Sequence, residues 1–449
     1  MDAKPSRPSF EAIRAMLADM PPPDLEAAAA AREREAQLTK PAGSLGRLEE
    51  IAEWLAAWQG RHPPAVERPL AVVFAGNHGV VEQGISAFPQ AVTAQMVANF
   101  QAGGAAVNQL CQAFGIGLKV YELALERPTR DITREAAMDE ADCAATMVYG
   151  MEAVAEGPDL LCIGEMGIGN TTVAAAIALA LHGGRAEDWV GPGTGLDAAG
   201  VAHKADVVRR AVERHAGDLD DPLEVLRRLG GREIAGMCGA ILAARLARVP
   251  VLIDGYVATA AAAILQAADG AALDHCLAAH RSAEPAHGAL LEKLGKRPIL
   301  DLGMRLGEAS GAALAAATVM AAARVHAGMA TFASAGVSGR TGRSRLYRVS
   351  PTGTTEMERM RGPRAQRSAS VRSRWAPSFQ PGHSTTCVWT SIPAPVSSRS
   401  CSTISPPRGT PRRRIRTSGS VAWTLTYSGE SFWSIRRWNP FGPRFVSVT

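Results

Sequence analysis

The stretch LLCIGEMGIGNTTVAAAIALAL, residues 160–181, restricts the fold more than any other part of this chain. It begins with four apolar residues, which are too few for a helix but suit a buried strand. A turn containing Gly167 and Gly169 follows, and then an Ala/Ile/Leu-rich helix that Gly183 can end. A strand, a glycine turn and a helix in this order present free backbone N–H groups and the positive end of a helix dipole. The stretch therefore predicts an anion site.

The residues of this turn indicate which anion could bind. Gly167 and Gly169 have no Cβ, so the backbone can approach a ligand closely, and Thr171 and Thr172 add hydroxyl donors. The turn contains neither the lysine of GxxxxGK[ST] nor the spacing GxGxxG. A triphosphate and a dinucleotide are therefore not expected, whereas a monophosphate fits.

A second glycine loop, residues 191–195 (GPGTG), is too rich in Gly and Pro for a helix or a strand. Lys204 lies on the helix predicted after this loop. A lysine at this distance could meet a phosphate as a point charge. The alternative is an ordinary surface lysine in contact with water.

Short apolar runs alternate with helical patterns along the chain and predict strands at residues 70–75, 118–123, 160–163, 249–253 and 299–302. This alternation predicts an α/β fold with a doubly wound parallel sheet. Polar, glycine-rich loops follow the strands or precede helices. In such sheets ligands bind beyond the carboxyl ends of the strands, so these loops predict the site.

Glu308 stands in a glycine-rich turn with apolar neighbours, just before a predicted helix. One interpretation is a favourable charge at a helix N-terminus. The other is a partly desolvated carboxylate whose raised pKa suits it to accept a proton. His78, after the first predicted strand, could likewise be a structural histidine or a catalyst.

Several potential metal ligands gather in one region: Asp274, His275, Cys276, His280 and His287. Their spacing matches neither HExxH nor a paired Cys/His motif, so no metal site is predicted. The seven cysteines show no CxxC spacing and are expected to be reduced core residues. The N-terminus lacks a signal-peptide pattern and no apolar run is long enough to span a membrane, so a soluble, cytoplasmic protein is expected.

Charge divides the chain into two parts. Residues 1–339 contain 29 Lys+Arg and 40 Asp+Glu, whereas residues 340–449 contain 19 Arg, no Lys and 3 Glu. The second part is rich in Arg, Ser and Pro and shows no periodic apolar face, which predicts a non-globular, disordered and dispensable tail and suggests a frameshift product. The alternative is a nucleic-acid-binding extension, since Arg and Trp together suit single strands.

The chain resembles the nicotinate-nucleotide–dimethylbenzimidazole phosphoribosyltransferases of cobalamin synthesis. The matching stretches occur in collinear order: LTKPAGSLGRLE (38–49), GNHGVVEQGISAFPQAVTAQMV (76–97), GEMGIGNTT (164–172), WVGPGTGLD (189–197), PVLIDGYVATAAA (250–262), DHCLAAHRSAEPAH (274–287), LDLGMRLGEASGAALA (300–315) and GMATFASAGVS (328–338). The family usually has Gly after the catalytic Glu, whereas this chain has Ala309.

The resemblance implies a Rossmann-like sheet with a small helical domain formed by the N- and C-terminal segments, in a homodimer. It divides the chain into N-terminal helices of the small domain (1–60), a phosphoribosyl-transfer domain (61–300), a catalytic segment returning to the small domain (301–339) and the tail (340–449). The implied reaction moves the 5-phosphoribosyl group of nicotinate mononucleotide to 5,6-dimethylbenzimidazole, giving α-ribazole 5'-phosphate and nicotinate. The pyridinium leaving group is already cationic, so neither a cofactor nor a metal is expected.

The resemblance also implies roles for individual residues. By motif position Glu308 is the general base that takes the azole N–H proton. The ribose phosphate is expected to be held by Glu165, Gly167, Asn170, Thr171, Thr172, Gly193, Thr194 and Lys204. The azole pocket is expected to contain Ser86, Phe88, Gln95, Met304 and Leu306. The rival interpretations are a hydrolase that uses water in place of the azole, and a nucleic-acid-binding protein.

Overall fold

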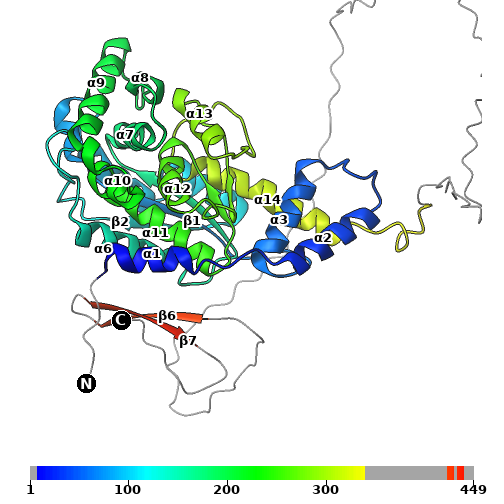
Figure 1. Cartoon of the computed structure of the whole chain (residues 1–449). Helices are drawn as coiled ribbons and strands as arrows, with labels where there is room; N and C mark the ends of the chain where they lie inside the picture. Colours follow the sequence, from blue (N-terminus) through cyan, green and yellow to red (C-terminus); the bar gives the residue numbers. More distant parts are fainter. Residues whose placement is uncertain (1–7, 339–421, 429–431, 439–449) are drawn as a thin grey trace, which may run out of the picture. The chain divides into compact units, whose positions relative to one another are not determined.

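The computed structural model describes residues 8–338, 422–428 and 432–438. Its centre is a parallel five-stranded sheet with the strand order β2-β1-β3-β4-β5 (Figure 1). The strands are β1 (Pro69–Ala75), β2 (Gly117–Glu122), β3 (Leu160–Met166), β4 (Val251–Ile253) and β5 (Cys276–Ala278). The predicted doubly wound α/β sheet is confirmed. Its order reverses between β1 and β3, where sheets of this topology bind ligands.

Both faces of the sheet are buried, which explains why its strands are continuous apolar runs. Along β1, Val72 and Phe74 pack into one apolar cluster, whereas Ala71 and Val73 pack into the other. This alternation follows from the two-residue period of a strand. Each face is covered by its own set of helices.

The first face packs with the larger set of helices. These are α1 (Phe10–Ala18), α6 (Glu140–Gly150), α7 (Asn170–His182), α8 (Ala186–Trp189), α9 (Ala198–His215), α10 (Pro222–Leu229), α11 (Arg232–Leu246), α12 (Tyr256–Ala268) and α13 (Pro285–Lys293). The second face packs with α3 (Arg47–Gln59), α4 (Val92–Gln101), α5 (Ala106–Phe114) and α14 (Ser310–Gly328). Short 3-10 helices lie at η1 (Gly79–Gln83), η2 (Met151–Val154) and η3 (Ala216–Asp218).

The predicted strand at 299–302 is wrong. The fifth strand is β5, whose three residues are too short to show a pattern in the sequence. Residues 299 and 300 instead extend the edge beyond β5: Ile299 N–H donates to Ala278 O, and His280 and Leu300 form an isolated bridge. Ile299 and Leu300 are partly buried against the second apolar cluster, whereas Leu302 is exposed, so the run is not a fully buried strand.

Helices α2 (Leu25–Gln37) and α3 pack together with α14, whereas α1 lies on the first face of the sheet (Figure 1). Arg34 donates hydrogen bonds to the carbonyl groups of His326, Ala327 and Met329, which satisfies the C-terminal end of α14. Lys40 pairs with Glu49 across the α2–α3 connection. This packing of terminal segments agrees with a small helical domain, but the domain boundaries stay a prediction.

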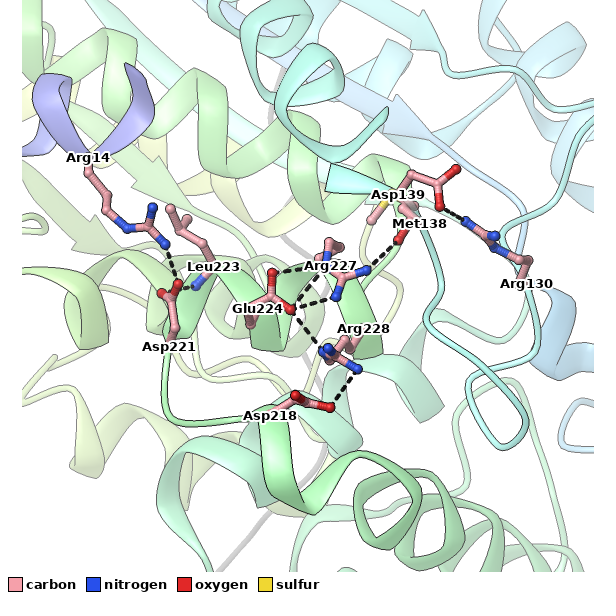
Figure 2. A network of polar contacts seen from close by, with 10 residues as sticks. All are labelled: Arg14, Arg130, Met138, Asp139, Asp218, Asp221, Leu223, Glu224, Arg227 and Arg228. Atoms are coloured by element: carbon pink, nitrogen blue, oxygen red, sulfur yellow. Dashed lines mark hydrogen bonds and ion pairs between the residues drawn. The ribbon is translucent and has the colours of Figure 1, made fainter. Parts of the chain in front are cut away.

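A polar network attaches α1 and α10 to the segment before α6 (Figure 2). Arg14 of α1 pairs with Asp221, which also caps α10 by accepting from Leu223 N–H. Glu224 pairs with Arg227 and Arg228 within α10. Arg227 Nη1 also donates to Met138 O before α6, so the network joins elements that are distant in sequence (Figure 2). Phe10, Ile13 and Leu17 pack α1 against the first face of the sheet.

The predicted disorder of residues 340–449 concerns positions outside the described residues, with one exception. The strands β6 (Ala422–Ser428) and β7 (Phe432–Trp438) pair antiparallel, and neither was predicted from the sequence. Within the described part of the chain, no helix combines the length and apolar character needed to cross a membrane.

Candidate active site

Polar side chains collect at the carboxyl edge of the sheet, on both sides of the β1/β3 switch point. His78 follows β1, Glu165 lies near the end of β3, and Asp254 follows β4. Glu308 stands just before α14. All four side chains are buried, so a charge on any of them acts on its neighbours with little screening by water.

The predicted anion turn lies between β3 and α7, as the sequence indicates. Gly169 has φ +92° and precedes the first residue of α7, a backbone shape that favours glycine. Gly167 packs so closely that a Cβ there would lie 2.8 Å from Gly76 O. Asn170 and Thr172 are buried and Thr171 is half-buried, so Thr171 is the member of this trio with a side chain open to solvent.

Lys204 of α9 reaches this turn. Its side chain is only 1% exposed, and Nζ donates to Thr171 Oγ1 (2.8 Å) and to Gly191 O (3.2 Å). Burial lowers the pKa of Lys204 to about 8, against the opposing effect of the Glu284 charge. An ammonium group has three donors, so one remains for an anion. The alternative of a surface lysine is wrong.

The second glycine loop lies next to the same lysine. A Cβ on Gly193 would stand 3.0 Å from Thr171 Oγ1 and 3.4 Å from Lys204 Nζ. Gly193 O accepts from Arg305 Nη1 at 2.7 Å, which links this loop to the segment before Glu308. Thr194 is exposed. Arg305 was not among the predicted site residues.

Glu165 and Asn170 are joined by a hydrogen bond from Asn170 Nδ2 to Glu165 Oε2. Burial raises the pKa of Glu165 well above its ordinary value, and the charges of Glu233, Asp254 and Glu308 raise it further. The Asn170 hydrogen bond opposes this shift. Glu165 is therefore set up as a protonated or hydrogen-bonding group and not as a free base.

Glu308 sits in a tight left-handed turn. Glu308 and Ala309 have φ values of +61° and +59°, a conformation that costs a non-glycine residue energy and often occurs at functional sites. This explains why glycine suits position 309. Gly164 of β3 allows the turn to approach the sheet, because a Cβ there would collide with the backbone of Ala309.

The environment of the Glu308 carboxyl group favours proton uptake. Glu308 is only 6% exposed. Burial is the larger cause of the rise in its pKa to about 7, and the charge of Asp254 is the smaller one. A carboxylate with such a pKa is matched to accept a proton near neutral pH. This burial favours the interpretation as a proton acceptor over that of a favourable charge at a helix N-terminus.

The predicted azole-binding residues come from two segments. Met304 and Leu306 lie on the segment that leads to Glu308, with Leu306 55% exposed and Met304 half-buried. Phe88 is 48% exposed, and Ser86 Oγ accepts from Phe88 N–H. Gln95 is exposed on α4. No hydrogen bond within residues 8–338 links Ser86, Phe88 or Gln95 to Glu308, so the azole pocket stays a prediction.

Two carboxylates of this site, Glu233 and Asp254, were not predicted from the sequence. Glu233 lies 2.9 Å from His78 Nε2, and both side chains are fully buried, which favours the structural interpretation of His78. Asp254 could have been found, since it directly follows a predicted strand. Glu233 could not, because only the folded chain shows that this helical residue is buried.

The histidines near Asp274 take part in internal contacts. His287 interacts with Thr259 Oγ1 (2.9 Å) and accepts from Ser282 N–H, and His275 donates to Ile241 O. Over the residues that the structure describes, no group of three or more His, Cys, Asp or Glu side chains is arranged to hold a metal ion.

Comparison with known proteins identifies the family. A family model described as phosphoribosyltransferase matches residues 20–337, which include every element of the site. The chain belongs to this family.

Relatives within the family are similar over almost their whole length. The nicotinate-nucleotide–dimethylbenzimidazole phosphoribosyltransferase of Rhizobium etli (strain CIAT 652) is 67% identical over 331 residues, 74% of this chain and 98% of the relative. The protein of the same name from Brucella anthropi is 65% identical, over 74% of this chain and 97% of the relative. The crystal structure of the phosphoribosyltransferase of this name from Thermus thermophilus has a TM-score of 0.66 and 42% identity, and covers 71% of this chain and 100% of its own.

Proposed function

We propose that this phosphoribosyltransferase transfers the 5-phosphoribosyl group of nicotinate mononucleotide to 5,6-dimethylbenzimidazole. The products are α-ribazole 5'-phosphate and nicotinate, in the assembly of the lower ligand of cobalamin. The names of relatives 65–67% identical support this reaction. The structural observation that carries it is a buried carboxyl group of raised pKa, Glu308, at the same sheet edge as an anion turn with a buried lysine.

The phosphate of the mononucleotide is expected at the anion turn. Lys204 Nζ and Thr171 Oγ1 supply charge and a hydroxyl donor, and the N-terminal N–H groups of α7 supply further donors. Gly167 and Gly193, which have no Cβ, are expected to let the backbone approach the phosphate. Thr194, at the exposed end of its loop, is expected to close over it. Glu165, Asn170 and Thr172 are expected to contact the ribose side of this group.

The transfer needs one base and no further activation. One azole nitrogen attacks the ribose C1, the bond from C1 to the pyridinium nitrogen breaks, and its electron pair neutralises the departing nicotinate ring. The azole would become cationic unless its other nitrogen loses a proton. Glu308 takes this proton, which removes the charge as it develops.

The azole is expected to lie on the apolar segment before Glu308, against Met304 and Leu306, with Ser86, Phe88 and Gln95 opposite. A flat aromatic ring there would cover side chains that are exposed in the single chain, Leu306 and Phe88. Leu302 is 61% exposed on the same segment. Apolar exposure of this extent also supports a homodimer, which sedimentation equilibrium of the full chain would measure.

The experiment is product analysis with the purified full chain. Nicotinate mononucleotide and 5,6-dimethylbenzimidazole should give one equivalent each of nicotinate and the ribosyl-azole phosphate, identified by mass spectrometry. Failure to form any azole-linked phosphate with a folded chain would contradict the proposal.

A further inference from the structure

Asp254 connects the sheet to the helix that follows Glu308. It directly follows β4, and its backbone N–H donates to Ile163 O of β3. Asp254 Oδ1 accepts from the backbone N–H of Ala312 at 2.8 Å, in the first turn of α14. The first N–H groups of a helix have no partner within the helix, so this carboxylate satisfies one of them from the interior.

The hydrogen bond from Ala312 is the main polar contact that the buried Asp254 carboxyl group makes. The side chain is 1% exposed and its Oδ2 atom has no hydrogen-bond partner among the described residues. His280 Nε2 lies 3.5 Å from Asp254 Oδ1, too far for a strong hydrogen bond. A buried carboxylate with an unpaired oxygen is costly, which favours a function beyond stability.

The hydrogen bond between Asp254 and Ala312 lies close to the strained Glu308 turn. Two consecutive left-handed residues precede α14, and such strain persists only where the surroundings hold it. Gly164 lies against Ala309 on one side of the turn, and Gly311 allows His280 to pack against the start of the helix. The hydrogen bond from Ala312 to Asp254 fixes the helix three residues beyond Ala309.

We propose that Asp254 is a positioning residue for Glu308, anchoring the first turn of α14 and keeping a negative charge close to the base. This inference rests on the proposed function. Glu165 of β3 and Asp254 after β4 are the carboxyl groups whose charges couple to Glu308. Glu233 of α11 couples to Glu165, and His280 after β5 faces Asp254. On its own segment, Arg305 precedes Glu308 by three positions. Asp254 is the one whose charge raises the pKa of Glu308 in addition to burial.

The test compares pH profiles of kcat for the wild type and Asp254→Asn. Asparagine keeps an oxygen that can accept from Ala312 N–H but removes the charge. The acid limb of the profile should move to lower pH by about one pH unit, with the mononucleotide KM changed less than about twofold. A merely structural contact would change stability and leave the position of this limb unmoved.

Asp159→Asn is the matched control. Asp159 accepts from the N–H groups of Glu67 and Arg68 just before β1, at the opposite edge of the sheet. Its acid limb should coincide with that of the wild type. If Asp254→Asn does not fold, Asp254→Ser keeps a hydroxyl acceptor, removes the charge and carries the same prediction.

The outcomes separate this inference from the proposed function. An acid limb that stays in place in a folded Asp254 variant, with an active wild type, would overturn the role of Asp254 alone. Failure of both Asp254 variants to fold, beside a folded control, would show a structural requirement and also overturn it. A wild type without transferase activity would instead overturn the proposed function.

Discussion

At the scale of single residues, the chemistry depends on the carboxyl group of Glu308. Glu308→Gln keeps the size and hydrogen-bonding capacity of this side chain but removes its basicity. We expect kcat to fall by about 10²–10⁴-fold with little change in mononucleotide affinity. Steady-state kinetics with dimethylbenzimidazole measure both quantities. Near-normal kcat in the Gln variant would exclude Glu308 as the base.

The pH dependence of the wild type follows from the same residue. The raised pKa of Glu308, about 7, means that the carboxylate form is present above this pH and is lost as the pH falls through it. The base is then protonated and cannot accept the azole proton, so kcat should decline below about pH 7. A kcat that stays constant well into the acid range would contradict this assignment.

Lys204 should control binding of the mononucleotide. Its pKa of about 8 means that the ammonium form is lost as the pH rises above this value, so the mononucleotide KM should rise there. Lys204→Ala should raise this KM by roughly 10-fold to 100-fold at neutral pH, because a charge-assisted contact is removed. Lys119→Ala is the control, because Lys119 lies on β2 and pairs with Glu156, and this variant should leave KM unchanged. Equal KM values in all three proteins would remove Lys204 from the site.

Single residues also show what the sequence could and could not indicate. Gly167, Thr171 and Glu308 can be proposed from the sequence because neighbours in the sequence create their local shape. Glu233 and the contact between Asp254 and Ala312 depend on elements far apart in the chain, so no local pattern records them. Arg305 was missed for the same reason, since its partner Gly193 lies 112 positions away.

At the scale of elements, the contact between β3 and the start of α14 determines the site. A methyl group at Gly164 would collide with the backbone of Ala309. Gly164→Ala should therefore lower the free energy of unfolding by about 1–3 kcal/mol and lower kcat, because the Glu308 turn must move. Gly217→Ala is the matched control, since a Cβ there meets no atom within 4 Å. Thermal unfolding that is equal for both variants would contradict this contact.

The elements themselves were predicted as far as their patterns are long enough. β1 and β3 have seven residues each, all of them buried, and the sequence places both within one residue at their starts. β5 has three residues and was missed, while the apolar run at 299–302 was mistaken for it. β4 is equally short but all of its residues are buried, and its apolar run was recognised, whereas β5 is only partly buried and its strand is defined by its pairing with β4.

At the scale of the whole molecule, the family part of the chain ends well before residue 449. The family model matches residues 20–337, and 331 residues of this chain account for 98% of the Rhizobium etli relative. A chain truncated after Arg340 should therefore keep its unfolding transition and its kcat. Loss of either in the truncated chain would show that the tail contributes to the enzyme.

The central claim is transfer to an azole and not hydrolysis, and the azole dependence of nicotinate release tests it most directly. Both reactions cleave the same bond of nicotinate mononucleotide, but only transfer needs the nucleophile that Glu308 deprotonates. We predict that the full chain releases nicotinate when dimethylbenzimidazole is present and that release is at most marginal without it. Release at the same rate with and without the azole would contradict the account.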